Sequence, residues 1–218
     1  MARAAVFGAS DGLVSNVSLI LGVAGAGPGP GVVRLAGLAG LIAGAVSMAA
    51  GEYVSMRAQS ELLERELEME RRELRRNPHV EMVELAQIYQ SRGMDPDRAR
   101  ELASELMSDP DLALETHARE ELGIDPASLG SPVGAAWWSF LSFALGALIP
   151  LLPWFVSSGG VARVASVVLG AIGAAVLGVA LAGFTGRSRV YTATRQVVIA
   201  AGAAAVTSVV GALGGVGV

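Results

Sequence analysis

Carboxylate side chains recur at helical spacing in the middle of this 218-residue chain. Glu66, Glu70 and Glu73 follow an i, i+4, i+7 pattern, which places them on one face of a helix about two turns long. Glu81 and Glu84 lie one turn apart in the segment that follows. Two rows of carboxylates at this spacing indicate a site for a cation.

A turn at residues 77–78 would bring the two rows together, and Glu120 or Glu121 could join them from a later helix. Oxygen-rich groups of this kind bind divalent cations, and di-iron proteins build such sites from glutamates on facing helices. Solvated helices also combine Glu with Arg, however, and the same stretch offers five pairing partners: Arg65, Arg71, Arg72, Arg75 and Arg76. The spacing leaves two interpretations open, a divalent-metal site and a solvent-exposed charged face.

A second group of chemically active residues lies in the apolar segments on either side. Asp11 and Glu52 are the only acids there, and an ionisable group inside a membrane costs about 2.5–3.5 kcal/mol even on a lenient insertion scale. Asn16 follows Asp11, and Met48 lies one turn before Glu52. A carboxylate and a thioether on neighbouring helices predict a desolvated site for a soft or borderline cation. The alternative for Met48 is an ordinary role in core packing.

Five apolar segments must position these residues. They are 21 to 27 residues long, enough to cross a hydrocarbon core of about 30 Å as helices, and cover residues 5–25, 32–56, 132–156, 160–185 and 190–216. We expect the first to be a retained helix and not a cleaved signal. Pro150 and Pro153 should kink the third. The predicted fold class is therefore all-α, a polytopic membrane protein with five transmembrane helices.

The insert between spans two and three should be a separate helical domain. It holds 18 of the 20 acids and ten arginines, a net charge of −8 in a chain of net charge −4. Asn77, Asp95 and Asp109 each precede a proline, as helix caps do, and Gly93 and Gly123 suit helix ends. We expect helices at residues 57–76, 78–91, 96–108 and 110–122, the first continuous with span two. The predicted domains are residues 1–56, 57–126 and 127–218.

Charge and composition limit the function and orient the chain. An acidic insert disfavours nucleic acid, and without cysteine there is no disulfide or thiolate metal site. If the insert is cytoplasmic, so is the N-terminus, and the C-terminus lies outside; 14 arginines then lie on the cytoplasmic side, against Arg34 and Arg163 on the other. The composition favours a bacterial plasma membrane. His79 and His117 stand alone, so we expect no enzyme.

Several motifs resemble those of the vacuolar iron transporter family over nearly the whole chain. They are GASDGLVSN at residues 8–16, AGAVSMAAGEY at 43–53, ELLERELEMERREL at 61–74 and REELG at 119–123. The resemblance implies a homodimeric antiporter that removes cytosolic ferrous iron, and often manganese, in exchange for protons. It places a membrane site at Asp11 and Met48, and cytoplasmic metal ligands at Glu70, Glu73, Glu81, Glu84 and Glu121.

One departure from that family adds a candidate ligand. Its members can carry methionines just before the last of these glutamates, where this chain has His117 and Ala118. His117 would lie about one turn from Glu120 and Glu121, and a neutral imidazole binds borderline metals. The alternative is that His117 is an exposed helix residue and no ligand. The expected substrates are Fe²⁺ or Mn²⁺, with Zn²⁺ or Co²⁺ as further ones in vitro. We expect no permanently bound cofactor; the expected partners are these ions, protons, the bilayer and a second copy.

Two functions remain open at this stage. One is an exporter of divalent metal, and the other is a membrane-anchored metal buffer or sensor whose spans only hold it in place. An anchor would need neither Asp11 and Asn16 nor a span kinked by proline. The sequence therefore favours transport.

Overall fold

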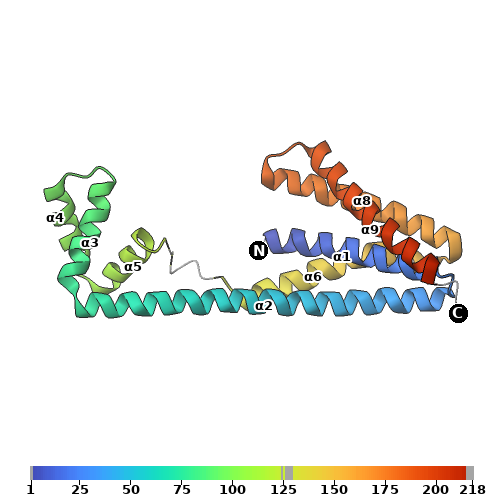
Figure 1. Ribbon diagram of the computed structural model, residues 1–218, viewed down its shortest axis with the longest axis horizontal. Helices are drawn as coiled ribbons and strands as arrows, with labels where there is room; N and C mark the ends of the chain where they lie inside the picture. Colours follow the sequence, from blue (N-terminus) through green and yellow to red (C-terminus); the bar gives the residue numbers. More distant parts are fainter. Residues whose placement is uncertain (1, 124, 126–129, 215–218) are drawn as a thin grey trace. The chain divides into compact units, whose positions relative to one another are not determined.

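The computed structural model describes residues 2–123, 125 and 130–214, and it is helical throughout its regular parts. Five helices are long and apolar enough to cross a membrane: α1 (Ala2–Gly25), α2 (Pro30–Arg76), α6 (Pro132–Leu151), α8 (Gly159–Thr185) and α9 (Arg189–Gly214). No strand occurs in the described ranges. The predicted all-α membrane fold with five spans is confirmed (Figure 1).

The chain divides into two compact units. One comprises Met1–Val54 and Pro132–Val218, and the other is Ser55–Ser131. The α2 helix runs without a break through both, as the sequence predicted for span two and the start of the insert. The unit boundaries lie within about five residues of the predicted domain limits.

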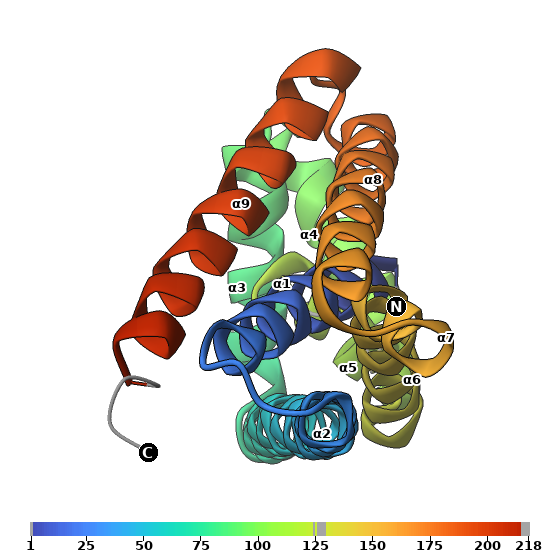
Figure 2. The same cartoon turned by 90° about the vertical axis from the view of Figure 1, so that its right-hand side faces the viewer.

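In the first unit, α1 lies between α6, α8 and α9 (Figure 2). Glycines allow α1 and α6 to approach closely: a methyl group at Gly12 would lie 2.1 Å from the Phe143 carbonyl oxygen, and one at Gly146 would lie 2.1 Å from that of Ala9. Gly8 and Gly12, four residues apart on α1, thus serve packing within the chain. This packing fixes the face of α1 that carries Asp11.

The third span is interrupted where the sequence predicted only a kink. The α6 helix ends at Leu151, and the short α7 (Pro153–Val156) follows. The Pro150 carbonyl oxygen accepts a hydrogen bond from Ser166 Oγ at 2.7 Å, and Ser166 Oγ accepts one from Trp154 Nε1 at 3.0 Å. The side chain of Ser166, on α8, thus satisfies a carbonyl group next to the break.

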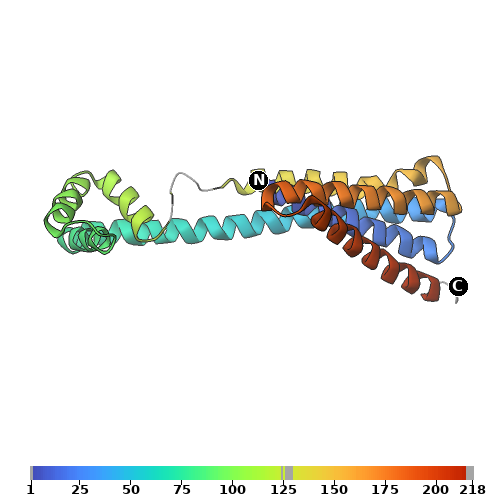
Figure 3. The same ribbon diagram turned by 90° about the horizontal axis from the view of Figure 1, so that it is seen from above.

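The second unit consists of the C-terminal part of α2 with α3 (Pro78–Ser91), α4 (Pro96–Leu106) and α5 (Pro110–Glu120) (Figure 3). Leu85, Ala86, Ala99 and Ala103 form its apolar core. All three short helices begin at the predicted prolines, and α4 and α5 end two residues earlier than predicted. This core therefore joins α3 to α4.

Two of the three predicted helix caps are present. Asp95 and Asp109 each accept hydrogen bonds from backbone N–H groups of the first turn, at 3.0 and 2.9 Å for the shorter bond of each pair. The predicted cap at Asn77 is wrong, because its side chain makes no capping bond from a backbone at φ −134° and ψ 51°. Gly93 and Gly123, with φ of 94° and 66°, follow helices as predicted.

Candidate metal sites

Four potential metal ligands meet inside the second unit. They are Glu70 of α2, Glu81 of α3, and His117 and Glu121 at the end of α5, and one ligand atom from each lies within 4.8 Å of the others. His117 Nδ1 lies 3.2 Å from Glu70 Oε1, 3.3 Å from Glu121 Oε2 and 4.0 Å from Glu81 Oε2. Three carboxylates and one imidazole nitrogen therefore face one point.

Most of this group is withdrawn from solvent. Glu70 is 3% exposed, Glu81 7% and His117 0%. Glu70 Oε1 accepts no hydrogen bond of normal geometry within the described part of the chain, although His117 Nδ1 lies near it. Burying carboxylates without compensation is unfavourable, so this arrangement calls for positive charge. A divalent cation would supply it.

The electrostatics of the group point the same way. Burial raises the pKa of Glu81, and the charges of Glu70 and Glu84 raise it further. Burial also raises the pKa of Glu121, against its hydrogen bond with His117. For His117, burial lowers the pKa, but the nearby carboxylates of Glu70 and Glu121 outweigh burial and raise the pKa overall. Each of these three groups therefore holds a proton more readily than it would in water, and a metal ion would compete with that proton.

The other predicted insert ligands lie outside this group. Glu73 and Glu84 are exposed, although both charges raise the pKa of Glu81 and so act on the site from its edge. Glu120 forms an ion pair with Arg92. His117, which the sequence offered as a candidate ligand because it differs from the family motif, lies at the centre of the group. The ligand roles of all these residues stay predictions.

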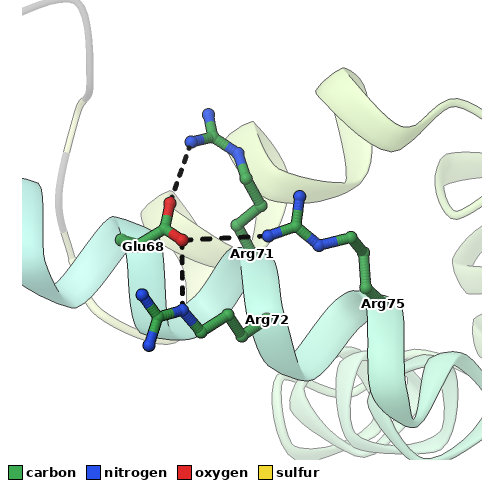
Figure 4. A network of polar contacts seen from close by, with 4 residues as sticks. All are labelled: Glu68, Arg71, Arg72 and Arg75. Atoms are coloured by element: carbon green, nitrogen blue, oxygen red, sulfur yellow. Dashed lines mark hydrogen bonds and ion pairs between the residues drawn. The ribbon is translucent and has the colours of Figure 1, made fainter.

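The solvated-face interpretation applies to another side of α2. Glu68 lies 3.3 Å from Arg71, 3.1 Å from Arg72 and 3.8 Å from Arg75, with all four side chains exposed (Figure 4). Hydrogen bonding from Arg72 lowers the pKa of Glu68. One helix therefore carries ordinary surface ion pairs on one side and, two residues later, the buried carboxylate of Glu70.

A second candidate site is an open cavity of about 490 Å³ in the first unit, between α1 and α2. Its lining includes all four side chains that the sequence assigned to the transport pathway: Asp11, Asn16, Met48 and Glu52. Asp11 and Asn16 come from α1, and Met48 and Glu52 come from α2. Two carboxylates, an amide and a thioether thus share one cavity.

Sequence reasoning missed several other residues that line this cavity. Ser15 and Ser47 add hydroxyl groups, and Gly40 and Gly44 leave α2 without side chains beside it. Ser15 follows Asp11 by four residues, so helical spacing would have found it. Ser47 directly precedes Met48, and helical spacing does not place adjacent residues on one face. Gly40 and Gly44 are themselves four residues apart.

Fold and sites together define a polytopic membrane protein with two candidate cation sites, one in its spans and one in its acidic insert. The chain belongs to the VIT family, whose model matches residues 2–212. The resemblance found in the sequence motifs is thereby confirmed.

Relatives extend this similarity to proteins from several organisms. A vacuolar iron transporter of Acanthamoeba castellanii is 41% identical over 181 residues, which cover 79% of this chain and 66% of the relative. A vacuolar iron transporter of Centaurea cyanus is 31% identical over 204 residues, or 93% of this chain and 83% of the relative. Vacuolar iron transporter 2 of Oryza sativa subsp. japonica is 32% identical over the same shares. The chain thus spans about two thirds of the Acanthamoeba protein.

Proposed function

We propose that this protein transports iron across a membrane, and specifically that it exports cytosolic Fe²⁺, and Mn²⁺, in exchange for protons. One observation carries the proposal: Asp11, Asn16, Met48 and Glu52 line the same cavity between two membrane-spanning helices. The names of the relatives support iron as the substrate. Ionisable groups at membrane depth are expensive and typically mark ion pathways.

The two sites divide the work in this proposal. The insert, on the cytoplasmic side with the N-terminus, captures the cation through Glu70, Glu81, His117 and Glu121. The cavity carries it across, and Asp11 exchanges it for a proton, because a carboxylate must lose its proton to bind metal. We further propose a homodimer in a bacterial plasma membrane, with the C-terminus outside.

A metal buffer or sensor is the second candidate function. One feature favours it: the four insert ligands all belong to one compact unit, so they need nothing from the spans to bind a cation. A buffer would leave the membrane cavity without a role. Metal flux therefore separates the two functions, whereas metal binding does not.

The test is uptake of Fe²⁺, kept reduced, and of Mn²⁺ into proteoliposomes with and without an imposed pH gradient. We expect uptake against the metal gradient only when the lumen is acidic, and we expect Asp11→Asn to abolish it while the protein remains folded. Asp111→Asn, on the exposed first turn of α5, is the matched control and should behave like wild type. Gradient-driven uptake by Asp11→Asn at the wild-type rate would remove Asp11 from the pathway; metal binding without flux would establish the buffer.

A further inference from the structure

The amide of Asn16 is held in one orientation. Asn16 is 2% exposed, and its Nδ2 donates a 2.7 Å hydrogen bond to the Ala147 carbonyl oxygen of α6. A carbonyl oxygen can only accept, so the amide nitrogen must face α6 and the amide oxygen must face away from it. The packing of α1 on α6 thus decides which atom Asn16 presents elsewhere.

The other end of this amide, the oxygen Oδ1, is a hydrogen-bond acceptor without a donor. Oδ1 is buried and has no hydrogen-bond partner among the described residues. It lies beside Gly40 of α2, where an added methyl group would come within 3.1 Å of it. Asn16 and Gly40 both line the membrane cavity. A buried acceptor left unpaired is unfavourable, so a partner from the cavity is expected.

The Leu19 side chain lies near this oxygen. The methyl position at Gly40 that lies 3.1 Å from Oδ1 lies 2.4 Å from Leu19 Cδ2, so both atoms occupy the space that the glycine leaves free. Leu19 is 37% exposed and also lines the cavity. A rotation of its side chain toward the open side would give an ion in the cavity access to Oδ1.

We propose that Asn16 Oδ1 is a neutral ligand for the transported cation and forms a second binding position beyond Asp11. This inference rests on the proposed transport function. Asn16 follows Asp11 by five residues, about 7.5 Å along a helix axis, so one ion leaves the carboxylate to reach the amide. An amide oxygen binds hard cations without losing a proton. Binding at Asn16 is therefore independent of proton exchange.

The proposal predicts a change of metal preference that packing alone does not. An amide oxygen suits Mn²⁺, whereas a thioether suits softer ions. Asn16→Leu should lower the rate of Mn²⁺ uptake about tenfold. Asn16→Met should make Zn²⁺ a stronger competitor, so that the Zn²⁺ concentration needed to halve Mn²⁺ uptake falls about tenfold. If Asn16 only holds α1 against α6, both variants lose Mn²⁺ uptake alike and the Zn²⁺ value stays at that of wild type.

A second variant reaches the same atom without touching Asn16. Gly40→Ala places a methyl group in the space beside Oδ1 and keeps the bond to Ala147, so it should slow Mn²⁺ uptake as Asn16→Leu does. Gly31→Ala is its matched control, because a methyl group there meets nothing within 4 Å. Ser18→Ala is the control on α1, since its buried hydroxyl also has no hydrogen-bond partner in the described part of the chain, but Ser18 borders a different cavity. Both controls should match wild type.

The experiment uses the full chain in proteoliposomes at a fixed pH gradient, with thermal melting of each variant in detergent. Wild-type Mn²⁺ uptake in both Asn16→Leu and Gly40→Ala, or an unchanged Zn²⁺ value in Asn16→Met, would overturn the role of Asn16 and leave transport standing. Failure of wild type to move either metal would overturn the proposed function itself. If an Asn16 variant melts far below wild type, Mn²⁺ uptake by Gly40→Ala decides whether Asn16 Oδ1 is a ligand.

Discussion

His117 joins proton and metal chemistry at a single atom. Its Nδ1 faces three carboxylates, and the net effect of burial and of Glu70 and Glu121 is to raise its pKa above the usual 6.5. Protonated imidazole cannot bind metal, so a metal ion must displace a proton from this nitrogen. Binding at the insert should therefore tighten as pH rises through the neutral range.

The prediction for His117 follows from that competition. Metal affinity of the full chain should rise more steeply between about pH 6 and pH 8 in wild type than in His117→Gln, where only carboxylates titrate. Calorimetry with Mn²⁺ in the Asp11→Asn background isolates the insert site. His79→Gln, an exposed change on α3, is the control. Parallel pH profiles for wild type and His117→Gln would show that His117 is no ligand.

Raised pKa values also set how the metal-free insert responds to pH. Glu81, Glu121 and His117 all have raised pKa values, so the folded state binds more protons than the unfolded state does. The stability that these protons provide is present at low pH and is lost as pH rises from about 4.5 through the raised values. Hydrogen exchange of α3 and α5 amides should therefore become faster, relative to the intrinsic rate, toward pH 8, and added Mn²⁺ should reverse this.

Spacing predicted part of this site and left part undecided. A 3.6-residue period tells which carboxylates share a face of α2, and it correctly grouped Glu70 with its neighbours. It does not tell which of them turns inward, because that depends on how α3 and α5 pack. Glu70 and Glu81 are buried, while Glu73 and Glu84, three residues from each, are exposed. Tertiary contacts made that choice.

At the scale of elements, an Asx-Pro pair fixed where each insert helix begins. This signal depends on neighbouring residues alone, since proline suits the first helical position and the preceding side chain can accept hydrogen bonds from backbone N–H groups. The backbone geometry at the cap residue depends also on the elements on either side of it. Asn77 lies between α2 and α3 and makes no side-chain cap, although its carbonyl oxygen accepts from Val80 and Glu81. The break after Pro150 likewise depends on Ser166 of another helix.

The caps give a graded prediction. Asp95→Ala and Asp109→Ala should each destabilise the insert by about 1 kcal/mol, because each removes an acceptor for N–H groups that have no other partner in the helix. Asn77→Ala should change stability far less, since no capping bond is lost. Hydrogen exchange of α3, α4 and α5 in the full chain measures the three variants. An equal loss in all three would mean that the Asn77 side chain does cap α3.

At the scale of the whole molecule, one continuous helix belongs to both units, and each unit carries its own candidate site. The proposed division of work makes the sites kinetically separable. Capture affects how much metal is needed, whereas crossing sets how fast a loaded transporter turns over. A defect in the insert should therefore be overcome by raising the metal concentration, and a defect in the cavity should not.

The last prediction tests that separation in one experiment. Glu70→Gln together with Glu81→Gln should raise the Mn²⁺ concentration for half-maximal flux by about 10- to 100-fold and leave the maximal rate near wild type, because the amides remove ligand charge but leave the cavity intact. Asp11→Asn should instead lower the maximal rate at every concentration. The control is Glu61→Gln with Glu64→Gln, which alters two exposed carboxylates of the same helix; both form ion pairs with Arg57. If the buried double variant lost its maximal rate as Asp11→Asn does, the insert would be part of the crossing step and not a separate site of capture.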